Sequence, residues 1–328
     1  MIISSGQRTD IPAFYSEWFM NRIREGYVMV RNPFYPMQVT RYRLTPDVAD
    51  VLSFCTKNPE PMLPYIRELK ERGYAMHWFV TITPYGKEIE PGVPDKARVM
   101  ESTRKLSELL GDADVPGRRR TAWRYDPVLI LDPYDVDYHI ETFRKMAETL
   151  SGAVDQCVIS FVDLYEKTRR NFPEVRPVRR EERIAIGRAF AEIGKTNGIT
   201  VRSCFEGTEL APFGVDISGC FTKEVLERAV GSELAVPKRV MARQTTGQEV
   251  ELGKGCDCVF GHDIGAYNTC THFCRYCYAN YDRETVLKNV RLHDPESPFL
   301  VGGPLPGDEV HEAKQAPYRT GQYQLPFL

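Results

Sequence analysis

The sequence contains no apolar run that approaches the roughly 20 residues needed by a membrane-spanning helix. Residues 1–6 lack the basic start and the long apolar core of a secretory signal. The 43 basic and 45 acidic residues nearly cancel, so the composition shows no global attraction for nucleic acid or an anionic membrane. We therefore expect a cytoplasmic protein without a membrane partner.

A disulfide framework is not expected either, because the nine cysteines would lie in a reducing compartment. Seven of them follow residue 203, and cysteines gathered in this way in such a compartment indicate metal binding. The other two, Cys55 and Cys157, stand within short apolar runs. A free cysteine in that setting behaves as a small core residue, which is how we interpret both.

Short β-branched or aromatic runs alternate along the chain with longer helical patterns. The predicted strands are residues 1–5, 51–55, 76–82, 122–125, 157–162 and 200–204. The predicted helices lie near residues 12–25, 60–72, 95–110, 135–151, 180–196 and 222–230. Strands that alternate with helices of this length form parallel βαβ units.

We therefore predict an α/β fold, namely a parallel (β/α) barrel or partial barrel of six to eight strands with an irregular cysteine-rich C-terminal segment. Residues 1–236 would form the barrel body. Residues 237–290 would supply a closing strand and a cysteine loop, and residues 291–328 a C-terminal wrap in the same domain. The sequence shows no linker long enough to divide the chain.

Polar residues follow the predicted strands at the point where each strand ends. In a parallel barrel these ends share one rim, and the reactive groups lie there. Each residue alone has a structural alternative, such as a helix cap for Asp10 or a surface ion pair for Lys57. Because such residues occur on six successive strands, with Thr81 and Thr83 on the third, we predict an active site at this rim. The predicted residues are Arg8, Asp10, Thr56, Lys57, Asn58, Arg124, Asp126, Asp163 and Glu206.

Cys270, Cys274 and Cys277 form a C-x3-C-x2-C run on one short segment. Three such thiolates can hold three irons of a cubane cluster, because soft sulfur ligands suit iron–sulfur centres. The run has no fourth cysteine, which leaves one iron free to coordinate a substrate or cofactor. Zinc also accepts cysteines at this spacing, and cysteines without any ligand are a third alternative. We favour a [4Fe–4S] cluster.

With the aromatic Tyr276 before its last cysteine, this run resembles the signature of radical S-adenosylmethionine enzymes. Residues 266–280 look like the corresponding string of the spore photoproduct lyase group, and residues 8–10, 56–58 and 90–91 resemble other segments of that group in the same order. That family has its cysteine loop near the N-terminus, whereas here the loop lies near the C-terminus. A circular permutation would reconcile the two, with residues 259–264 as a strand beside residues 1–5.

The whole chain also resembles a bacterial family called domain of unknown function 1848, and that likeness suggests no activity. The radical-enzyme resemblance implies S-adenosylmethionine at the open iron and its reductive cleavage to methionine and a 5′-deoxyadenosyl radical. It also implies an electron donor such as flavodoxin or ferredoxin. The substrate is unknown, and analogy suggests a nucleic acid.

Under this resemblance the rim residues divide into two groups. The candidate catalytic residues are Lys57, Arg124, Asp126 and Asp163. Lys57 or Arg124 would pair the methionyl carboxylate. The candidate cofactor-binding residues are Arg8, Asp10, Thr56, Asn58, Glu206 and Tyr276. The alternative class is a non-radical barrel, stabilised by zinc or an iron–sulfur cluster, that binds nucleic acid or senses redox state.

Four further cysteines predict a second site. Cys204 ends a predicted strand, Cys220 follows in the next loop, and Cys256 and Cys258 precede the C-x3-C-x2-C run. Closure of a barrel would bring all four together. We favour an auxiliary [4Fe–4S] cluster here, with a structural zinc ion and unliganded thiols as the alternatives.

Overall fold

A computed structural model describes residues 1–112, 120–236, 241–243, 249–251, 257–259 and 261–319. The strands are β1 (Ile2–Ser5), β2 (Tyr27–Arg31), β3 (Gln38–Arg43), β4 (Val51–Thr56), β5 (Met76–Thr81), β6 (Thr121–Val128), β7 (Gln156–Phe161), β8 (Thr200–Ser203), β9 (Met241–Arg243), β10 (Glu249–Glu251), β11 (His262–Asp263) and β12 (Glu309–Glu312). The α-helices are α1 (Ile11–Phe14), α2 (Ser16–Glu25), α3 (Ile66–Glu71), α4 (Lys96–Leu110), α5 (Val136–Leu150), α6 (Glu166–Asn171), α7 (Arg180–Thr196), α8 (Lys223–Val230) and α9 (Arg283–Arg291). Two 3₁₀ helices are η1 (Glu60–Tyr65) and η2 (Ala211–Phe213).

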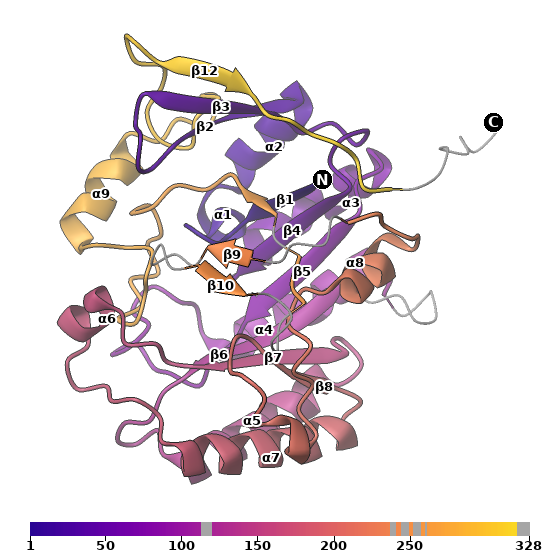
Figure 1. Ribbon diagram of the computed structural model, residues 1–328, viewed down its shortest axis with the longest axis vertical. Coiled ribbons are helices and arrows are strands. Elements are labelled where there is room, and N and C mark those ends of the chain that lie inside the picture. Colours follow the sequence, from indigo (N-terminus) through magenta and orange to yellow (C-terminus); the bar gives the residue numbers. More distant parts are fainter. Residues whose placement is uncertain (113–119, 237–240, 244–248, 252–256, 260, 320–328) are drawn as a thin grey trace.

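Seven strands form one parallel sheet in the order β11, β1, β4, β5, β6, β7, β8. Figure 1 labels the strands from β1 to β8. The N-terminal strand β1 is the second strand from one edge, and Ile3 lies opposite both Leu52 and His262. Among the described strands no pairing joins the edges β8 and β11. The α/β class and the parallel sheet are therefore confirmed, while closure into a barrel stays a prediction.

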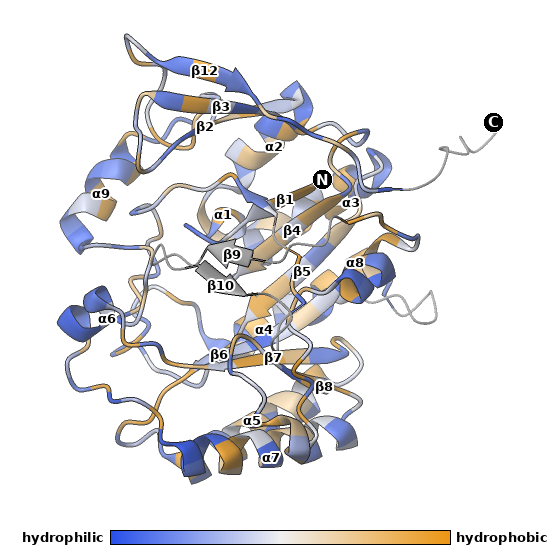
Figure 2. Ribbon diagram, in the orientation of Figure 1, coloured by the Kyte–Doolittle hydropathy of each residue, from blue (hydrophilic) through white to orange (hydrophobic). Residues whose placement is uncertain are grey.

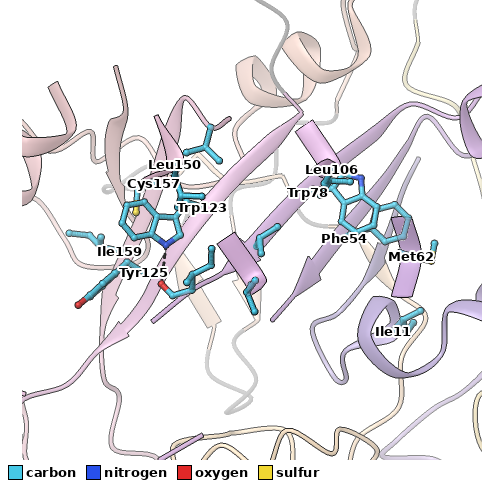
Figure 3. Packing of buried hydrophobic residues seen from close by; sticks show 14 of the residues in the cluster. Ile11, Phe54, Met62, Trp78, Leu106, Trp123, Tyr125, Leu150, Cys157 and Ile159 are labelled. Atoms are coloured by element: carbon cyan, nitrogen blue, oxygen red, sulfur yellow. Dashed lines mark hydrogen bonds between the residues drawn. The ribbon is translucent and has the colours of Figure 1, made fainter. Parts of the chain in front are cut away.

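Large aromatic side chains fill the space between one face of the sheet and its helices. Phe54 and Trp78, on neighbouring strands, stack with ring centroids 4.0 Å apart (Figure 3). Trp123 of β6 stacks on Phe143 of α5 at 4.7 Å, and Phe143 stacks on Phe190 of α7 at 3.7 Å. These aromatic contacts bury large apolar areas and fix α5 and α7 together against the sheet.

The ends of the helices follow from local sequence. Asp95 accepts the N–H of Ala97 at 2.9 Å at the start of α4, and Asp135 accepts the N–H of Tyr138 at 2.8 Å at the start of α5. After α7 the chain turns through Gly198, whose φ of +70° favours glycine. Figure 2 shows β4 and β7 as mostly apolar, whereas α7 and α8 carry both apolar and polar residues, as partly buried helices do.

The other face of the sheet changes from apolar to polar along the strands. Because strand side chains alternate, Val51, Ser53 and Cys55 of β4 share this face, as do Phe79 and Thr81 of β5. Val51 and Phe79 belong to a second apolar cluster that α8 covers. Ser53, Cys55 and Thr81 line a cavity nearer the carboxyl ends of the strands, which Phe79 also reaches. This change along each strand is what positions the candidate site.

The six strands predicted from the sequence are all present, and the predicted helices correspond to α1–α2, η1–α3, α4, α5, α7 and α8. The predicted strand at 259–264 is limited to β11, and its parallel pairing with β1 is confirmed. The hairpin of β2 and β3, the helices α6 and α9, and β12 were not predicted. β12 pairs with β3, so the C-terminal segment does return to the N-terminal part of the fold (Figure 1).

Within the described ranges, no helix combines the length and apolar character needed to cross a membrane.

Gly6 directly follows β1 and packs against β4. Its φ is +134°, and a methyl group at this residue would overlap the carbonyl oxygen of Cys55. We expect Gly6→Ala to lower the free energy of unfolding by about 3 kcal/mol, because it adds a backbone clash to a conformation that alanine disfavours. Urea denaturation followed by circular dichroism measures the change.

Gly73→Ala is the matched control, since Gly73 also has a positive φ of +85° but nothing lies within 4 Å of the added methyl group. It should cost about 1–2 kcal/mol, the intrinsic penalty of a left-handed residue. Equal losses in the two variants would mean that the close approach of Gly6 to β4 is not a constraint.

Candidate functional site

A cavity of about 420 Å³ opens at the carboxyl ends of the sheet strands. Its wall includes Ser5 at the end of β1, Thr56 of β4, Thr81 of β5 and Asp126 of β6, together with Cys204 just after β8. All strands of a parallel sheet end at the same edge, so one cavity collects side chains from segments far apart in sequence. The volume is that of a small-molecule site.

Most of the residues predicted for the site line this cavity. They are Asp10, Thr56, Lys57, Arg124, Asp126, Asp163, Cys204, Cys220, Cys258, Cys270, Cys274, Tyr276 and Cys277. Arg8, Asn58 and Glu206 do not line it. Arg8 lies 3.5 Å from the carboxylate of Asp263 in β11, and Asn58 accepts the N–H of Glu60 at 3.2 Å. Both therefore hold nearby backbone together. Cys256 lies outside the described residues.

Glu206 is also used by the backbone, because its carboxylate accepts the N–H of Phe161 at 2.8 Å. Arg183 lies 3.8 Å away. Burial raises the pKa of Glu206 to about 7, despite the opposing effects of that N–H and of Arg183. Glu206 therefore titrates near neutral pH at the carboxyl end of β7, outside the cavity wall.

The loop after β11 carries Cys270, Cys274 and Cys277, which we call the cysteine loop (residues 270–277). Burial raises the pKa of each of the three thiols, so the loop alone holds neutral thiols at pH 7. Cys277 Sγ accepts the N–H of Ala279 at 3.3 Å, and an N–H aimed at sulfur supports a thiolate. A bound cation would therefore convert these thiols to the anionic ligands that a metal requires.

Backbone contacts hold the cysteine loop against the segment after β5. Gly92 donates its N–H to the carbonyl of His272 at 2.8 Å, and Arg275 donates to the carbonyl of Ile89 at 3.0 Å. A side chain at Gly92 would run into the backbone of residues 271 and 272. The close approach therefore depends on glycine at this position.

Asp10 ties three elements together. One carboxylate oxygen accepts the N–H of Ala13 at 3.0 Å and caps α1, while the other accepts the N–H of Lys57 at 2.8 Å. That second oxygen also lies 2.8 Å from Nε2 of His272 in the cysteine loop. The helix-cap alternative for Asp10 is therefore observed, and the same residue positions the loop.

Glu90 is fully buried and is the centre of a second network. Its carboxylate accepts hydrogen bonds from Lys57 at 2.8 Å and Thr83 at 2.7 Å, and from Lys96 and Tyr276. Burial opposes ionisation, but the two lysines outweigh it and lower the pKa of Glu90 to about 2. Burial likewise opposes the charge of Lys57, yet Glu90 and the nearby cysteine loop raise its pKa. The network thus keeps a cation beside the cysteine loop.

Arg124 and Asp126 form a charged pair in the cavity wall. Arg124 Nε donates to Asp126 at 2.9 Å, the hydroxyl of Ser160 donates to the other carboxylate oxygen, and the guanidinium lies over the ring of Phe79 at 5.2 Å. The thiols that act electrostatically on Arg124 include Cys220, whereas Lys57 is influenced by the cysteine loop. Lys57 and Arg124 are therefore affected by different thiols of the cavity wall.

Three of the four remaining clustered cysteines meet. Cys220 Sγ lies 3.5 Å from Cys204 Sγ and 3.6 Å from Cys258 Sγ, and we call these three the thiol trio. The predicted convergence is confirmed for them. Within the part of the chain that the structure describes, no three His, Cys, Asp or Glu side chains already surround a position for a single metal ion. Metal binding by either set of cysteines stays a prediction.

Sequence reasoning did not assign site roles to Glu90, Lys96 or His272. The only sequence feature that pointed to Glu90 is that residues 90–91 resemble a segment of the spore photoproduct lyase group. Nothing in the sequence pairs it with Tyr276, which lies 186 residues further along the chain. Such partners become visible only once the strands are assembled.

Glu90→Gln should destabilise the protein by about 3 kcal/mol, because it leaves two partly buried lysines without their counter-charge. Glu101→Gln is the matched control, since Glu101 forms an exposed pair with Lys105 one helical turn away. The control should cost less than about 0.5 kcal/mol. Chemical denaturation of both variants measures the difference, and equal effects would contradict the assigned network.

The same network predicts a pH dependence. The pKa of Glu90 is lowered in the folded protein to about 2 from an ordinary value of 4.5. Its contribution to stability is therefore complete above the ordinary value and is lost as the pH falls toward 2. Across this acidic range, the free energy of unfolding should fall more steeply in the wild type than in Glu90→Gln. Parallel slopes for the two proteins would count against the lowered pKa.

No curated protein matches the chain. A family model described as a domain of unknown function (DUF1848) matches residues 2–279. The matched region runs from β1 through the whole cysteine loop, and so includes every strand of the parallel sheet and the described cavity wall. Because the match covers well over half of the 328 residues, the chain belongs to the DUF1848 family.

Proposed function

We propose that the protein is a radical S-adenosylmethionine enzyme whose [4Fe–4S] cluster is held by Cys270, Cys274 and Cys277. One observation carries the proposal. Three thiols of a single loop line one cavity at the carboxyl edge of a parallel sheet, and the C-x3-C-x2-C run offers no fourth thiolate. A cluster held in this way keeps one iron open toward the cavity.

The surroundings of the cysteine loop fit a cluster. Burial keeps the thiols neutral until a cation binds, as described above. Asn280 donates its side-chain N–H to the carbonyl of Cys270 at 2.8 Å, and Tyr15 donates to the carbonyl of Thr269 at 2.6 Å. The loop is therefore already ordered for binding.

When bound together, the cluster and S-adenosylmethionine would supply reductive cleavage to methionine and a 5′-deoxyadenosyl radical. Lys57 would hold the methionyl carboxylate. Its ammonium has three N–H donors, of which Glu90 accepts one, and the raised pKa keeps it charged. Lys57 is favoured over Arg124 for this role because it both lines the cavity and interacts with the cysteine loop, whereas Arg124 is paired with Asp126.

The remaining rim residues would serve the substrate. Asp126 and Arg124 hold each other in the cavity wall, and Asp163 lines the wall with one oxygen accepting the hydroxyl of Tyr165 at 3.1 Å. Phe161 and Phe205 contribute apolar surface to the same wall. The chain thus offers a charged pair and aromatic surface to a compound whose identity the fold does not specify.

An acidic electron donor such as flavodoxin or ferredoxin would bind on the outer side of the cysteine loop. Cations of α6 lie directly on the segment that follows the loop. Lys167 donates to the carbonyl of Tyr278 at 2.9 Å, and Arg170 donates to the carbonyl of Tyr281 at 2.7 Å. Positive charge at this point would attract an acidic redox protein to the side nearest Cys277.

The proposal is tested by anaerobic reconstitution with iron and sulfide, followed by dithionite and S-adenosylmethionine. The wild type should bind about four irons at the cysteine loop and release 5′-deoxyadenosine, detected by chromatography. The variant Cys270→Ala/Cys274→Ala/Cys277→Ala should release none. Cleavage by this triple variant at the wild-type rate would overturn the assignment.

Cys157→Ser is the matched control, because Cys157 is buried within β7 and does not line the cavity. It should retain iron and release 5′-deoxyadenosine. A wild-type protein that takes up zinc but no iron would instead favour the alternative class, a non-radical barrel stabilised by metal.

A further inference from the structure

The thiol trio is built by two backbone junctions. Cys204 follows β8, and its N–H donates to the carbonyl of Ile159 in β7 at 3.0 Å. Cys220 and Cys258 lie on two segments that pair antiparallel, since Val259 donates its N–H to the carbonyl of Phe221 at 2.8 Å. Both junctions use main-chain hydrogen bonds. The meeting of the three sulfurs is therefore set by the fold and not by side-chain rotamers alone.

The two sulfur separations that involve Cys220 are those of ligands to one ion. In a tetrahedral zinc site with Zn–S bonds of about 2.3 Å, neighbouring sulfurs are about 3.8 Å apart. Cys220 Sγ lies 3.5 Å from Cys204 Sγ and 3.6 Å from Cys258 Sγ. A cubane would place each sulfur on a different iron and spread them further. The spacing therefore favours a single ion over the auxiliary cluster that the sequence suggested.

We propose that Cys204, Cys220 and Cys258 bind one thiolate-seeking divalent ion of the zinc class. The ion would draw the outer sulfurs around Cys220, because among the described residues the shell is not yet closed around one point. Binding would release the three thiol protons. The backbone N–H of Phe221 donates to Cys258 Sγ at 3.4 Å and would stabilise the negative charge on that sulfur.

All three cysteines line the cavity, so the ion would lie at the cavity wall. Arg124 lines the same wall and interacts electrostatically with Cys204 and Cys220. The trio would therefore form a second metal centre on the cavity, independent of whether the cysteine loop carries an iron–sulfur cluster.

The test compares the metal content of the full-length wild type with that of Cys220→Ser, which removes the central sulfur. Each protein is purified anaerobically from medium containing both iron and zinc, and metals are measured by mass spectrometry. The wild type should hold about one zinc per chain at the trio. Cys220→Ser should lose that zinc and keep its iron. Cys270→Ala/Cys274→Ala/Cys277→Ala and Cys157→Ser should both keep the zinc.

Cobalt gives a second measurement that does not depend on the metal acquired in the cell. Co²⁺ added to the metal-free wild type should produce sulfur-to-cobalt charge-transfer absorption and the visible bands of a tetrahedral site. Cys220→Ser, shown to be folded by circular dichroism, should produce much weaker bands. Cys258→Ser should give the same loss.

Three results would overturn the inference. One is a loss of about half the iron in Cys220→Ser with no change in zinc, which would mean an auxiliary cluster. Another is a zinc content that follows the cysteine loop and not the trio. The last is a disulfide between two of the three cysteines in anaerobically purified protein, detected by thiol alkylation. If the proposed radical cluster does not form, the zinc content, the cobalt absorption and the thiol alkylation still decide the inference.

Discussion

The pairing of β11 with β1 is the constraint on which the rest of the candidate site depends. It places Asp263 opposite Ser4, so a loop near the end of the chain starts from the same sheet edge as the first strand. Arg8 extends the junction beyond the strands by donating its N–H to Asp263 at 2.8 Å. With this register fixed, the cysteine loop can lie only at the carboxyl edge of the sheet, and each of its contacts with the cavity wall follows from that position.

Two buried carboxylates then fix the position of the cysteine loop more precisely than apolar packing could. Asp10 acts through directional hydrogen bonds: its two carboxylate oxygens contact the N–H of Ala13 in α1, the N–H of Lys57 after β4, and His272. Glu90 acts through its charge, because its ion pair with Lys57 offsets the cost of burying the lysine ammonium. Burying an ion is costly unless it is paired and hydrogen-bonded, so such groups add little net stability. What they provide is one arrangement in which a cation, a tyrosine hydroxyl and a sulfur-rich loop stay together.

Much of the sheet was predictable from the sequence, because strands such as β4 and β7 are continuous apolar runs bounded by polar residues. The rim residues were predictable for the same reason, since strand ends share an edge. The hairpin of β2 and β3 was missed because its strands are half polar and, among the described strands, pair only with each other and with β12. Arg8 and Glu206 carry the right charge at the right strand ends, yet their side chains are used by neighbouring backbone. The alternation of residues along a strand does not reveal whether a polar side chain faces the cavity or bonds to nearby backbone.

The two sets of cysteines line one cavity but are assembled differently. The trio brings sulfurs from three separate segments into contact, as ligands of one ion would be, whereas the cysteine loop supplies its three thiols from one short C-x3-C-x2-C run. The cations divide between the two sets, with Lys57 beside the loop and Arg124 influenced by the trio. If both proposed centres form, Arg124 and Asp126 remain in the cavity wall as a charged pair. A compound that separated the pair would have to supply a hydrogen-bond acceptor for the guanidinium and a donor for the carboxylate, because either group left unpaired in the wall would cost more than the contact returns.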